Sequence, residues 1–347
     1  MRLSGAAADA DTLLAPLAAE PALLLAVSGG PDSVALMLLA ARWTQRPQNL
    51  RIYVATVDHG LRPQSLQEAQ RVGDWARALG FQHRLLRWEG EKPHTRIQER
   101  AREARYSLLA ACAREIDPAC ALVTAHHADD QAETILFRLC RGSGVAGLAG
   151  MARVSTLNGM KVLRPLLETP KAALEAICIA AGQPFLRDPS NENPKFARAR
   201  LRALGATLAA PGLDREALLR LGRRAARAGA ALEACAAQAQ ARALVELDAS
   251  FARFDAETLR NCPREILIRL IEAQILRLGG GAPRLDRLER AAEAVASALE
   301  ARTRARLTLA GVLIDASPPS LWMKLAPPRG ETPRVRREAG LTAAKTS

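Results

Sequence analysis

The chain has 347 residues, a formal net charge of +13, a sequence pI near 10.3, 49% hydrophobic and only 3% aromatic residues. This length predicts two or three domains, and the positive surplus favours a polyanionic partner. Because no apolar run approaches the ~20 residues of a membrane helix and Asp9 and Asp11 interrupt the first apolar stretch, a membrane-spanning or secreted protein is excluded and a cytoplasmic one is expected.

Residues 22–41 predict a buried strand, a glycine-rich turn and a helix. The turn is Ser28-Gly29-Gly30-Pro31-Asp32-Ser33. Adjacent glycines let backbone N–H groups form an anion nest, and the helix start adds its positive dipole. Asp32 would repel a bare phosphate but fits a site where Mg²⁺ lies between carboxylate and phosphates. The alternative is an ordinary strand-to-helix turn with a serine or aspartate cap.

Strands and helices alternate through the following residues. Strands are predicted at 51–57, 81–86, 121–125 and 161–163, and helices at 64–80, 96–114, 130–140 and 170–181. This alternation predicts a doubly wound parallel α/β sheet, whose ligands bind beyond the carboxyl ends of the strands. Three polar segments follow strand ends and should meet in one crevice: 28–33, 58–62 and 126–130.

The chain changes character after residue 188. Helical patterns cover 213–245, 256–278 and 283–298, strand patterns cover 304–314 and 321–325, and residues 327–347 are polar and basic. We expect a catalytic domain at 1–208, a smaller and mainly helical domain at 209–328, and a disordered tail at 329–347. The six cysteines form no C-x-x-C pair, so neither a zinc finger nor an iron–sulfur ligand set is predicted.

A second motif, TAHHADDQAET, runs from Thr124 to Thr134. An ordinary capping box explains its acidic residues but not the two histidines before them. His126 and Asp130 are four residues apart and share a face if the helix has already begun. A hydrolytic metal site is the alternative, although the rest of its ligand set is missing.

Two further segments are ambiguous by themselves. Gly142 to Gly147 spell G-x-G-x-x-G but follow a helix rather than a strand, so a flexible loop at the crevice is expected instead of a dinucleotide site. Arg102 and Arg105 share a helix face in the segment ERAREARY, which ends at Tyr106. That face is either a solvated, ion-paired surface or a contact for phosphate or tRNA backbone.

The order of these motifs resembles that of the bacterial tRNA(Ile)-lysidine synthase family, whose nucleotide-binding fold is adenine nucleotide alpha hydrolase-like. The first motif alone resembles the pyrophosphate-binding loop of the N-type ATP pyrophosphatases (PP-loop superfamily). The matching run covers about Ala22 to Arg202 and comprises SGGPDS, VDHGLR, ERAREARY, TAHHADDQAET with RLCRGSGVAGLAGM, RPLL and DPSNENPKFARARLR. Two residues depart from the family's usual pattern, Ala199 in place of asparagine and Cys140 in place of leucine.

The resemblance implies an ATP- and Mg²⁺-dependent ligase that joins free lysine to the wobble cytidine of a CAU-anticodon isoleucine tRNA. It also implies that residues 1–208 form the ATP-pyrophosphatase domain and that the helical region 209–328 is a tRNA-binding domain. It implies catalytic roles for Asp32, His126 and Asp130, with Asp32 also holding the metal. It places the substrate lysine at Asp130 and Glu133. Nucleotide contacts are implied for Ser28, Gly29, Gly30, Pro31, Asp32, Ser33, Asp58, His59 and Arg105, and tRNA contacts for Arg102, Arg141, Arg198, Arg200 and Arg202.

Three other functions share some of these features. A tRNA thiolase uses the same ATP-binding fold but generally carries paired cysteines, which this sequence lacks. A GMP- or arginine-type ligating pyrophosphatase has no need of a basic helical domain. A tRNA-binding protein with a relic ATP loop has no need of Asp32 or of the residues from His126 to Glu133. The sequence leaves the oligomeric state open, with a homodimer as one possibility.

Overall fold

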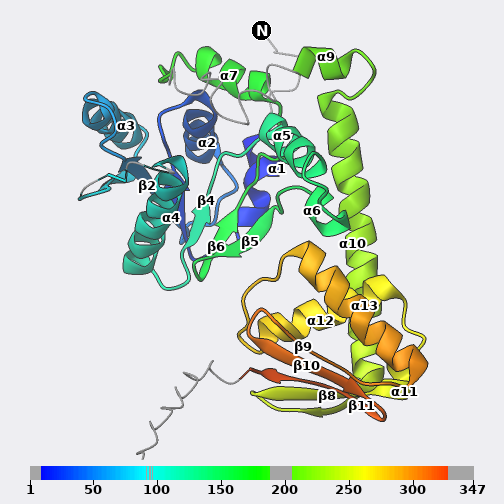
Figure 1. Cartoon of the computed structure of the whole chain (residues 1–347). Helices are drawn as coiled ribbons and strands as arrows, with labels where there is room; N and C mark the ends of the chain where they lie inside the picture. Colours follow the sequence, from blue (N-terminus) through cyan, green and yellow to red (C-terminus); the bar gives the residue numbers. More distant parts are fainter. Residues whose placement is uncertain (1–8, 91, 94, 96, 188–204, 327–347) are drawn as a thin grey trace, which may run out of the picture. The chain divides into compact units, whose positions relative to one another are not determined.

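The computed structural model describes residues 9–90, 92–93, 95, 97–187 and 205–326, shown in Figure 1. The chain divides into two compact units, residues 1–227 and 228–347. The division falls within the residues of the long helix α10 (Arg215–Ala243). Each unit has its own buried apolar cluster, so each is described by itself.

The first unit contains a six-stranded sheet with the order β3-β2-β1-β4-β6-β5. All neighbouring pairs are parallel except β5 and β6, which form an antiparallel hairpin at one edge. The predicted doubly wound sheet is therefore confirmed. The strands are β1 (Ala22–Ala26), β2 (Arg51–Asp58), β3 (Gln82–Arg87), β4 (Ala121–Val123), β5 (Val154–Leu157) and β6 (Met160–Leu163).

Helices cover both faces of this sheet because β1 is apolar on both sides. Leu23 and Leu25 pack with the helices of one face, and Ala22 and Leu24 with α4 on the other. The first face carries α1 (Ala10–Leu14), a 3₁₀ turn (Ala15–Leu17), α2 (Pro31–Arg42), α3 (Ser65–Ala78) and α7 (Lys171–Ala180). The remaining helices of the unit are α4 (Ile97–Ile116), α5 (Ala128–Leu139), α6 (Val145–Leu148) and α9 (Gly205–Ala209).

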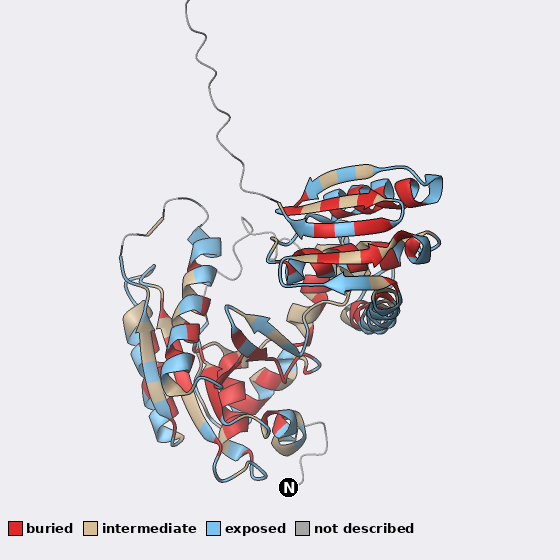
Figure 2. Ribbon diagram, turned by 90° about the horizontal axis from the view of Figure 1, so that it is seen from below, coloured by how far each residue is buried: buried red, intermediate tan, exposed pale blue. Residues whose placement is uncertain are grey.

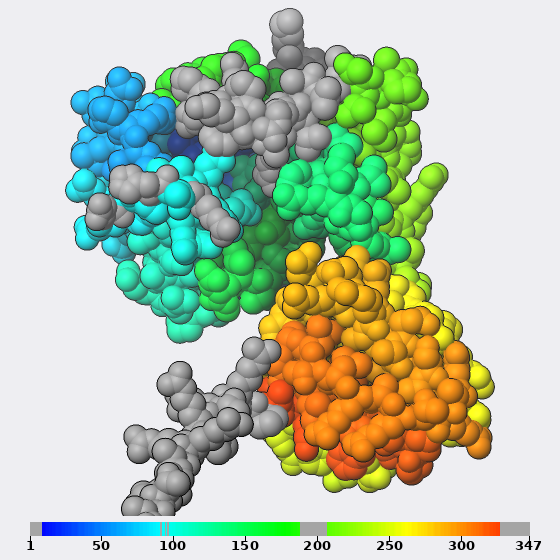
Figure 3. Space-filling model, viewed as in Figure 1, coloured from blue at the N-terminus to red at the C-terminus, as the bar shows by residue number. Residues whose placement is uncertain are grey.

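The strand order places a switch point beside β1. From β1 the chain moves to β2 and β3 on one side, and then returns to β4 on the other side. The loops that leave β1 and β4 therefore diverge at neighbouring strand ends, which is where open α/β sheets bind ligands. In the space-filling view, the first unit is hollowed between the cyan α4 and the teal-green α5 (Figure 3).

The second unit combines helices with a five-stranded antiparallel sheet in the order β7-β8-β11-β10-β9. The sequence patterns did not predict β7 and β8, and the single strand predicted at 304–314 is the hairpin of β9 and β10. The strands are β7 (Leu244–Leu247), β8 (Phe251–Asp255), β9 (Ala305–Leu309), β10 (Val312–Ser317) and β11 (Ser320–Leu325); the helices are α11 (Ala256–Leu259), α12 (Arg264–Arg277) and α13 (Leu285–Ala301).

Buried and partly buried residues alternate along β8 and β10 of this sheet, and Figure 2 shows buried segments in red along the strands of the second unit. Phe254, Ile314 and Met323 face the helices and are fully buried, whereas Trp322 and Lys324 lie on the open face. All six cysteines are free, and two of them, Cys140 and Cys235, are exposed rather than in a core. Among the described residues, no helix combines the length and apolar composition that crossing a bilayer requires.

Candidate active site

The turn after β1, residues 28–33, is named here the phosphate loop. Gly29 has φ +91°, a conformation that side chains disfavour, and a Cβ there would lie 2.6 Å from Leu186 Cδ1 and 2.9 Å from Val72 Cγ2. Residue 29 must therefore be glycine, because of its positive φ and because a Cβ would collide with two neighbouring side chains. Gly30 is the N-cap of α2 and offers no side chain to it, and Pro31 occupies the first turn. The start of α2 is thus left without a side-chain cap, as suits an anion site.

The two serines of the phosphate loop have different environments. Ser33 is buried, and its hydroxyl donates to the Gly30 carbonyl at 2.9 Å and accepts from the Ser28 amide at 3.1 Å. Ser28 is exposed, with its Oγ 3.3 Å from Ser33 Oγ. Ser33 therefore shapes the loop from inside, and Ser28 presents its hydroxyl at the surface.

Asp32 has one carboxylate oxygen that the protein leaves unsatisfied. Its Oδ1 is buried and makes no hydrogen bond, while its Oδ2 lies 3.5 Å from His127 Nε2. A buried, orphaned carboxylate oxygen at a helix start fits a Mg²⁺ ion, which is usually held by one or two carboxylates together with substrate phosphates. Within the described ranges no cluster of three or more His, Cys, Asp or Glu side chains could hold a metal without such phosphates.

His127 joins the phosphate loop to the second motif. It is the N-cap of α5 and is 4% exposed. Its Nε2 lies 3.5 Å from Asp32 Oδ2 and 3.4 Å from Asp130 Oδ2, and its Nδ1 lies 3.7 Å from Asp129 Oδ2. Three carboxylates from the first turns of α2 and α5 therefore surround one buried imidazole, which links the helix starts that follow β1 and β4.

The charge of His127 follows from these neighbours. Burial alone would lower its pKa, but the hydrogen bond to Asp32 and the charges of Asp130 and Asp129 outweigh burial, so the pKa is raised. The ring proton lies on Nε2, which faces the Asp32 and Asp130 carboxylates and reduces the repulsion between them. A capping box completes the arrangement: the Asp130 amide donates to His127 Nδ1 at 3.4 Å, and the His127 amide donates to Asp130 Oδ2 at 3.3 Å.

Both carboxylate oxygens of Asp129 contact other parts of the protein. Its Oδ2 accepts the Lys171 amide at the start of α7 at 2.9 Å, and its Oδ1 lies 3.3 Å from Arg215 Nη1. Burial would raise the pKa of this carboxyl, but the Lys171 amide and the charge of Arg215 lower it overall. Asp129 therefore ties α5 to α7 and to the first turn of α10.

From the sequence, His126 would share a face with Asp130 if the helix had already begun at His126. The structure begins α5 at Ala128, so His126 precedes the helix and its Nδ1 is hydrogen-bonded to Thr124 Oγ1 at 2.8 Å. Asp130 and Glu133 are partly buried in the first two turns of α5. Sequence reasoning missed His127, although a polar residue three positions before Asp130 is the signal of an N-cap.

Asp58 and His59 lie at the end of β2, the neighbour of β1. Asp58 is buried, and its Oδ1 accepts from Ser65 Oγ at 2.6 Å and from the Gly60 amide at 2.9 Å. The His59 ring stacks edge-on against Trp88 with centroids 6.3 Å apart, and its buried Nδ1 makes no hydrogen bond. Burial, and to a lesser extent the charge of Arg105, lower the pKa of His59.

The predicted tRNA contacts are only partly described. Arg102 is exposed on α4 and lies 5.1 Å from the Tyr106 ring, and Arg141 is exposed and 4.2 Å from the Phe137 ring. Arg198, Arg200 and Arg202 lie outside the described residues. The glycine-rich segment after Arg141 contains the short helix α6, and Arg138 Nη1 donates to the carbonyls of Gly147 and Gly150 at 2.8 and 2.7 Å.

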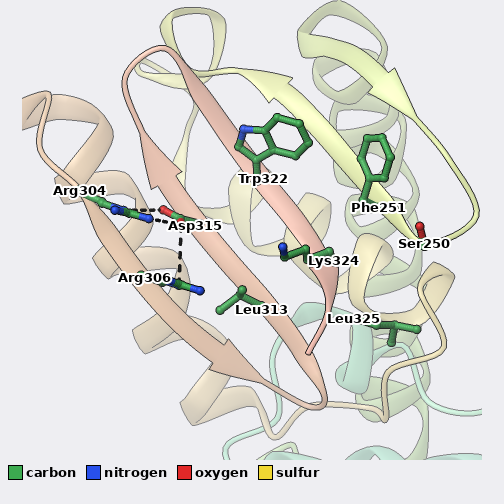
Figure 4. Close-up of a pocket in the computed structure, with 9 residues that line it drawn as sticks. All are labelled: Ser250, Phe251, Arg304, Arg306, Leu313, Asp315, Trp322, Lys324 and Leu325. Atoms are coloured by element: carbon green, nitrogen blue, oxygen red, sulfur yellow. Dashed lines mark hydrogen bonds and ion pairs between the residues drawn. The ribbon is translucent and has the colours of Figure 1, made fainter. Parts of the chain in front are cut away.

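The second unit has a separate hollow of about 580 Å³ on the open face of its sheet (Figure 4). Trp322 and Lys324 line it together with Phe251, whose ring centroid is 5.6 Å from that of Trp322. Beside them, Arg304 donates to both oxygens of Asp315 at 3.0 and 2.6 Å. This face is polar and aromatic, and both oxygens of its carboxylate, Asp315, already accept hydrogen bonds.

Comparisons with known proteins show which family the chain resembles. The PP-loop domain family model matches residues 4–206. A tRNA(Ile)-lysidine synthase of Methylobacterium sp. (strain 4-46) is 49% identical over 319 residues, covering 90% of this chain and 91% of that protein. The protein of that name from Rhodopseudomonas palustris is 47% identical over 333 residues, covering 93% and 96%.

Among solved structures, the chain resembles the U34-tRNA thiolase NcsA from Methanococcus maripaludis, solved with its 4Fe-4S cluster. The TM-score is 0.52 at 15% sequence identity, and the match covers 63% of this chain and 77% of that chain. A likeness at this identity concerns the fold of the ATP-binding sheet alone.

Proposed function

The chain belongs to the tRNA(Ile)-lysidine synthase family, and we propose that it joins the side-chain amine of free lysine to carbon 2 of the wobble cytidine of a CAU-anticodon isoleucine tRNA. In the first step the carbonyl oxygen of the base attacks the α-phosphorus of ATP and pyrophosphate leaves. In the second step the lysine amine attacks carbon 2 and AMP leaves. The product, lysidine, changes decoding and charging from methionine to isoleucine.

One observation supports this proposal above the others: His127 contacts both Asp32 of the phosphate loop and Asp130 of α5. The two half-reactions need different groups, an anion site for pyrophosphate and an acidic site for an amine. The contact brings these two kinds of site to adjacent strand ends, within the span of a small substrate.

At the phosphate loop, the backbone of Gly29 and Gly30 and the hydroxyl of Ser28 bind the departing pyrophosphate. Mg²⁺, when bound at Asp32, neutralises charge that builds on the phosphates. Ser33 holds the loop in shape through its bond to the Gly30 carbonyl, and Pro31 fixes the first turn of α2.

At the end of β2, Asp58, His59 and Arg105 contact the nucleoside and α-phosphate portion of ATP. Burial lowers the pKa of His59, so this ring is neutral at pH 7 and offers one donor and one acceptor. Arg105 supplies the positive charge that the transferred adenylate requires.

On α5, Asp130 and Glu133 bind the lysine. The lysine ammonium must lose a proton before it can attack. His126, oriented by Thr124, accepts that proton. His127 is a positioning residue here, because it is buried between carboxylates and holds Asp32 and Asp130 in register.

The reacting cytidine must leave its stack to enter the site, at a cost of a few kcal/mol that an anticodon loop lowers. Arg102 and Arg141, with Arg198, Arg200 and Arg202 outside the described residues, contact the tRNA. We place the enzyme in the cytoplasm, with its tRNA, ATP and lysine. The regions 1–208, 209–328 and 329–347 remain our functional division of the chain.

Incubation with ATP, Mg²⁺, bulk bacterial tRNA and radiolabelled lysine, followed by mild alkali, tests the proposal. Label that survives alkali is bonded to a base, whereas an ester to the terminal ribose is hydrolysed. We expect alkali-stable label and one pyrophosphate per lysine incorporated. Pyrophosphate release without lysine incorporation would contradict the proposed nucleophile, and tRNA binding without either signal would contradict catalysis.

A further inference from the structure

The first half of α10 has a packed face and an opposite, exposed face. Leu218, Leu219 and Ala225 are buried, and a Cβ on Gly222 would lie 2.6 Å from Ile135 Cδ1 of α5. At about 100° per residue, the side opposite these residues is formed by four exposed arginines. We name them the arginine stripe: Arg220, Arg223, Arg224 and Arg227.

The arginine stripe has no carboxylate against it in the part of the chain that the structure describes. The nearest acidic residue on the same helix, Glu216, lies 3.4 Å from Arg215 instead. Like charges three and four residues apart on a helix repel each other and destabilise it. The stripe therefore carries an electrostatic cost that an external polyanion would remove.

The arginine stripe is fixed relative to the catalytic residues, since both belong to the first unit. Leu218 packs with Ala132, Ile135 and Leu136 of α5. Arg215, at the start of α10, contacts Asp129 beside His127 and Asp130. From Arg215 to Arg227 the helix rises about 18 Å, so the stripe lies within the reach of one stem–loop arm of RNA whose loop enters the site.

We propose that the arginine stripe binds backbone phosphates of the tRNA arm that carries the reacting base; this rests on the proposed function. Guanidinium groups pair with phosphate oxygens in a planar, bidentate way, and such contacts position an RNA without reading its sequence. The stripe thus holds the anticodon arm while its wobble base enters the crevice.

The surroundings of the stripe favour nucleic acid over an acidic protein. The exposed positions beside the arginines are small or charged, with Ala226 and Glu216 as examples. A protein interface usually has a buried centre of aromatic or large aliphatic side chains, and this face offers none among its described residues. Four positive charges on about 10 Å of helix suit regularly spaced phosphates instead.

The test replaces all four stripe arginines with glutamine. A matched control replaces four exposed arginines of the second unit, Arg284, Arg287, Arg290 and Arg302, so the change in net charge is equal. Filter binding with tRNA and with an isolated anticodon stem–loop is measured between 50 and 300 mM KCl, conditions chosen to span roughly the range in which phosphate contacts weaken. Circular dichroism melting checks folding, and a fourfold Arg→Lys variant checks that charge is the cause.

We expect the glutamine variant to bind both RNAs about tenfold or more weakly than wild type. Its plot of log affinity against log salt should flatten by about 3, since each neutralised phosphate contributes about 0.7 to 0.9 to that slope. The control should stay within about twofold of wild type, and the lysine variant should keep most of the affinity and slope.

Unchanged affinity and slope in the glutamine variant, with wild type still attaching lysine to tRNA in an alkali-stable bond, would overturn this inference alone. An equal reduction of RNA affinity in the control variant would also overturn the inference, because positive charge anywhere on the surface would then explain the binding. A reduction confined to full-length tRNA would refute the assignment to the anticodon arm. Failure of wild type to bind tRNA would instead overturn the proposed function itself.

Discussion

On α10 in the first unit, Arg220 and its three companions face away from the packed side, and no carboxylate of the described residues meets them. On α13 in the second unit, Asp286 receives both Arg284 at 3.4 Å and Arg290 at 3.0 Å. The same pairing recurs through that unit, where further arginine–carboxylate contacts join Arg253 to Glu246, Arg264 to Glu293 and Glu300, Arg269 to Glu265, and Arg302 to Glu257.

The sequence composition of the two units agrees with this contrast. Residues 1–227 contain 31 basic and 22 acidic side chains, whereas residues 228–326 contain 13 and 12. The described part of the second unit is therefore nearly neutral, and most of the positive surplus lies in the first unit. An arginine-rich stretch predicts an RNA surface only where its charges lack internal partners, because paired arginines are already neutralised.

The same contrast between paired and unpaired charges exists for two aspartates, one in each unit. The first prediction tests this contrast and has the largest expected effect. Asp32 leaves one buried oxygen unsatisfied, while both oxygens of Asp315 accept from Arg304. We expect Asp32→Asn to lower tRNA-dependent pyrophosphate release by about a hundredfold or more, with little change in melting temperature or tRNA affinity. The measurement is pyrophosphate release at saturating ATP.

Asp315→Asn is the matched control for this experiment, since it removes the same charge from an engaged carboxylate. Its pyrophosphate release at saturating tRNA should match wild type. Comparable release by the Asp32 variant and wild type would remove Asp32 from the mechanism.

Two glycines give the second prediction. Gly29 and Gly311 have similar positive φ values, +91° and +85°, but a Cβ on Gly29 would meet Leu186 and Val72, whereas one on Gly311 would meet nothing within 4 Å. Both alanine variants should lose about 1–2 kcal/mol of stability from the backbone conformation. Only Gly29→Ala should also raise the KM for ATP severalfold or more, because the phosphate loop must shift.

Urea unfolding followed by ATP titration of the folded variants separates these two effects. A Gly29→Ala enzyme with a wild-type KM would show that the phosphate loop tolerates displacement, contrary to its close contacts.

The strand, phosphate loop and α2 could be predicted from sequence because a short apolar run, adjacent glycines and a helix-forming run specify the same local structure. The edge strand β5 could not be seen in the apolar pattern, since Val154 is exposed and the strand has four residues. Its turn did carry a signal: Asn158 and Gly159 have φ of +51° and +73°, and Asn-Gly favours a tight hairpin.

The members of the candidate site could be predicted from sequence more readily than their arrangement. Motif order identified Asp32 and the region from His126 to Glu133, but the choice between His126 and His127 depends on the residue at which α5 begins. Helix ends are poorly determined by local propensity, and a contact such as that of His127 with Asp32 depends on which strands are neighbours. The arginine stripe likewise required knowing which side of α10 is packed.

The third prediction has the smallest expected effect. It asks whether removing one carboxylate gives the second unit unpaired arginines that bind RNA, as proposed for the first unit. Asp315→Asn leaves Arg304 and Arg306 without their carboxylate, beside the exposed Trp322 and Lys324 (Figure 4). Free cations next to an aromatic ring are a common surface for single-stranded RNA. We expect tRNA affinity at low salt to rise a few-fold, and the gain to disappear at high salt; filter binding measures both.

The structural role of Asp315 provides the control for that gain. The hydrogen bond from Arg304 lowers the pKa of Asp315, so its stabilising contribution is fully present above the ordinary pKa of 3.8 and is lost as the pH falls through the lowered value. Wild type and Asp315→Asn should therefore differ slightly in urea stability at pH 7 and converge as the pH falls below the lowered pKa. Equal RNA affinities at low salt, with this convergence observed, would mean that pairing with carboxylates does not explain why the two units differ.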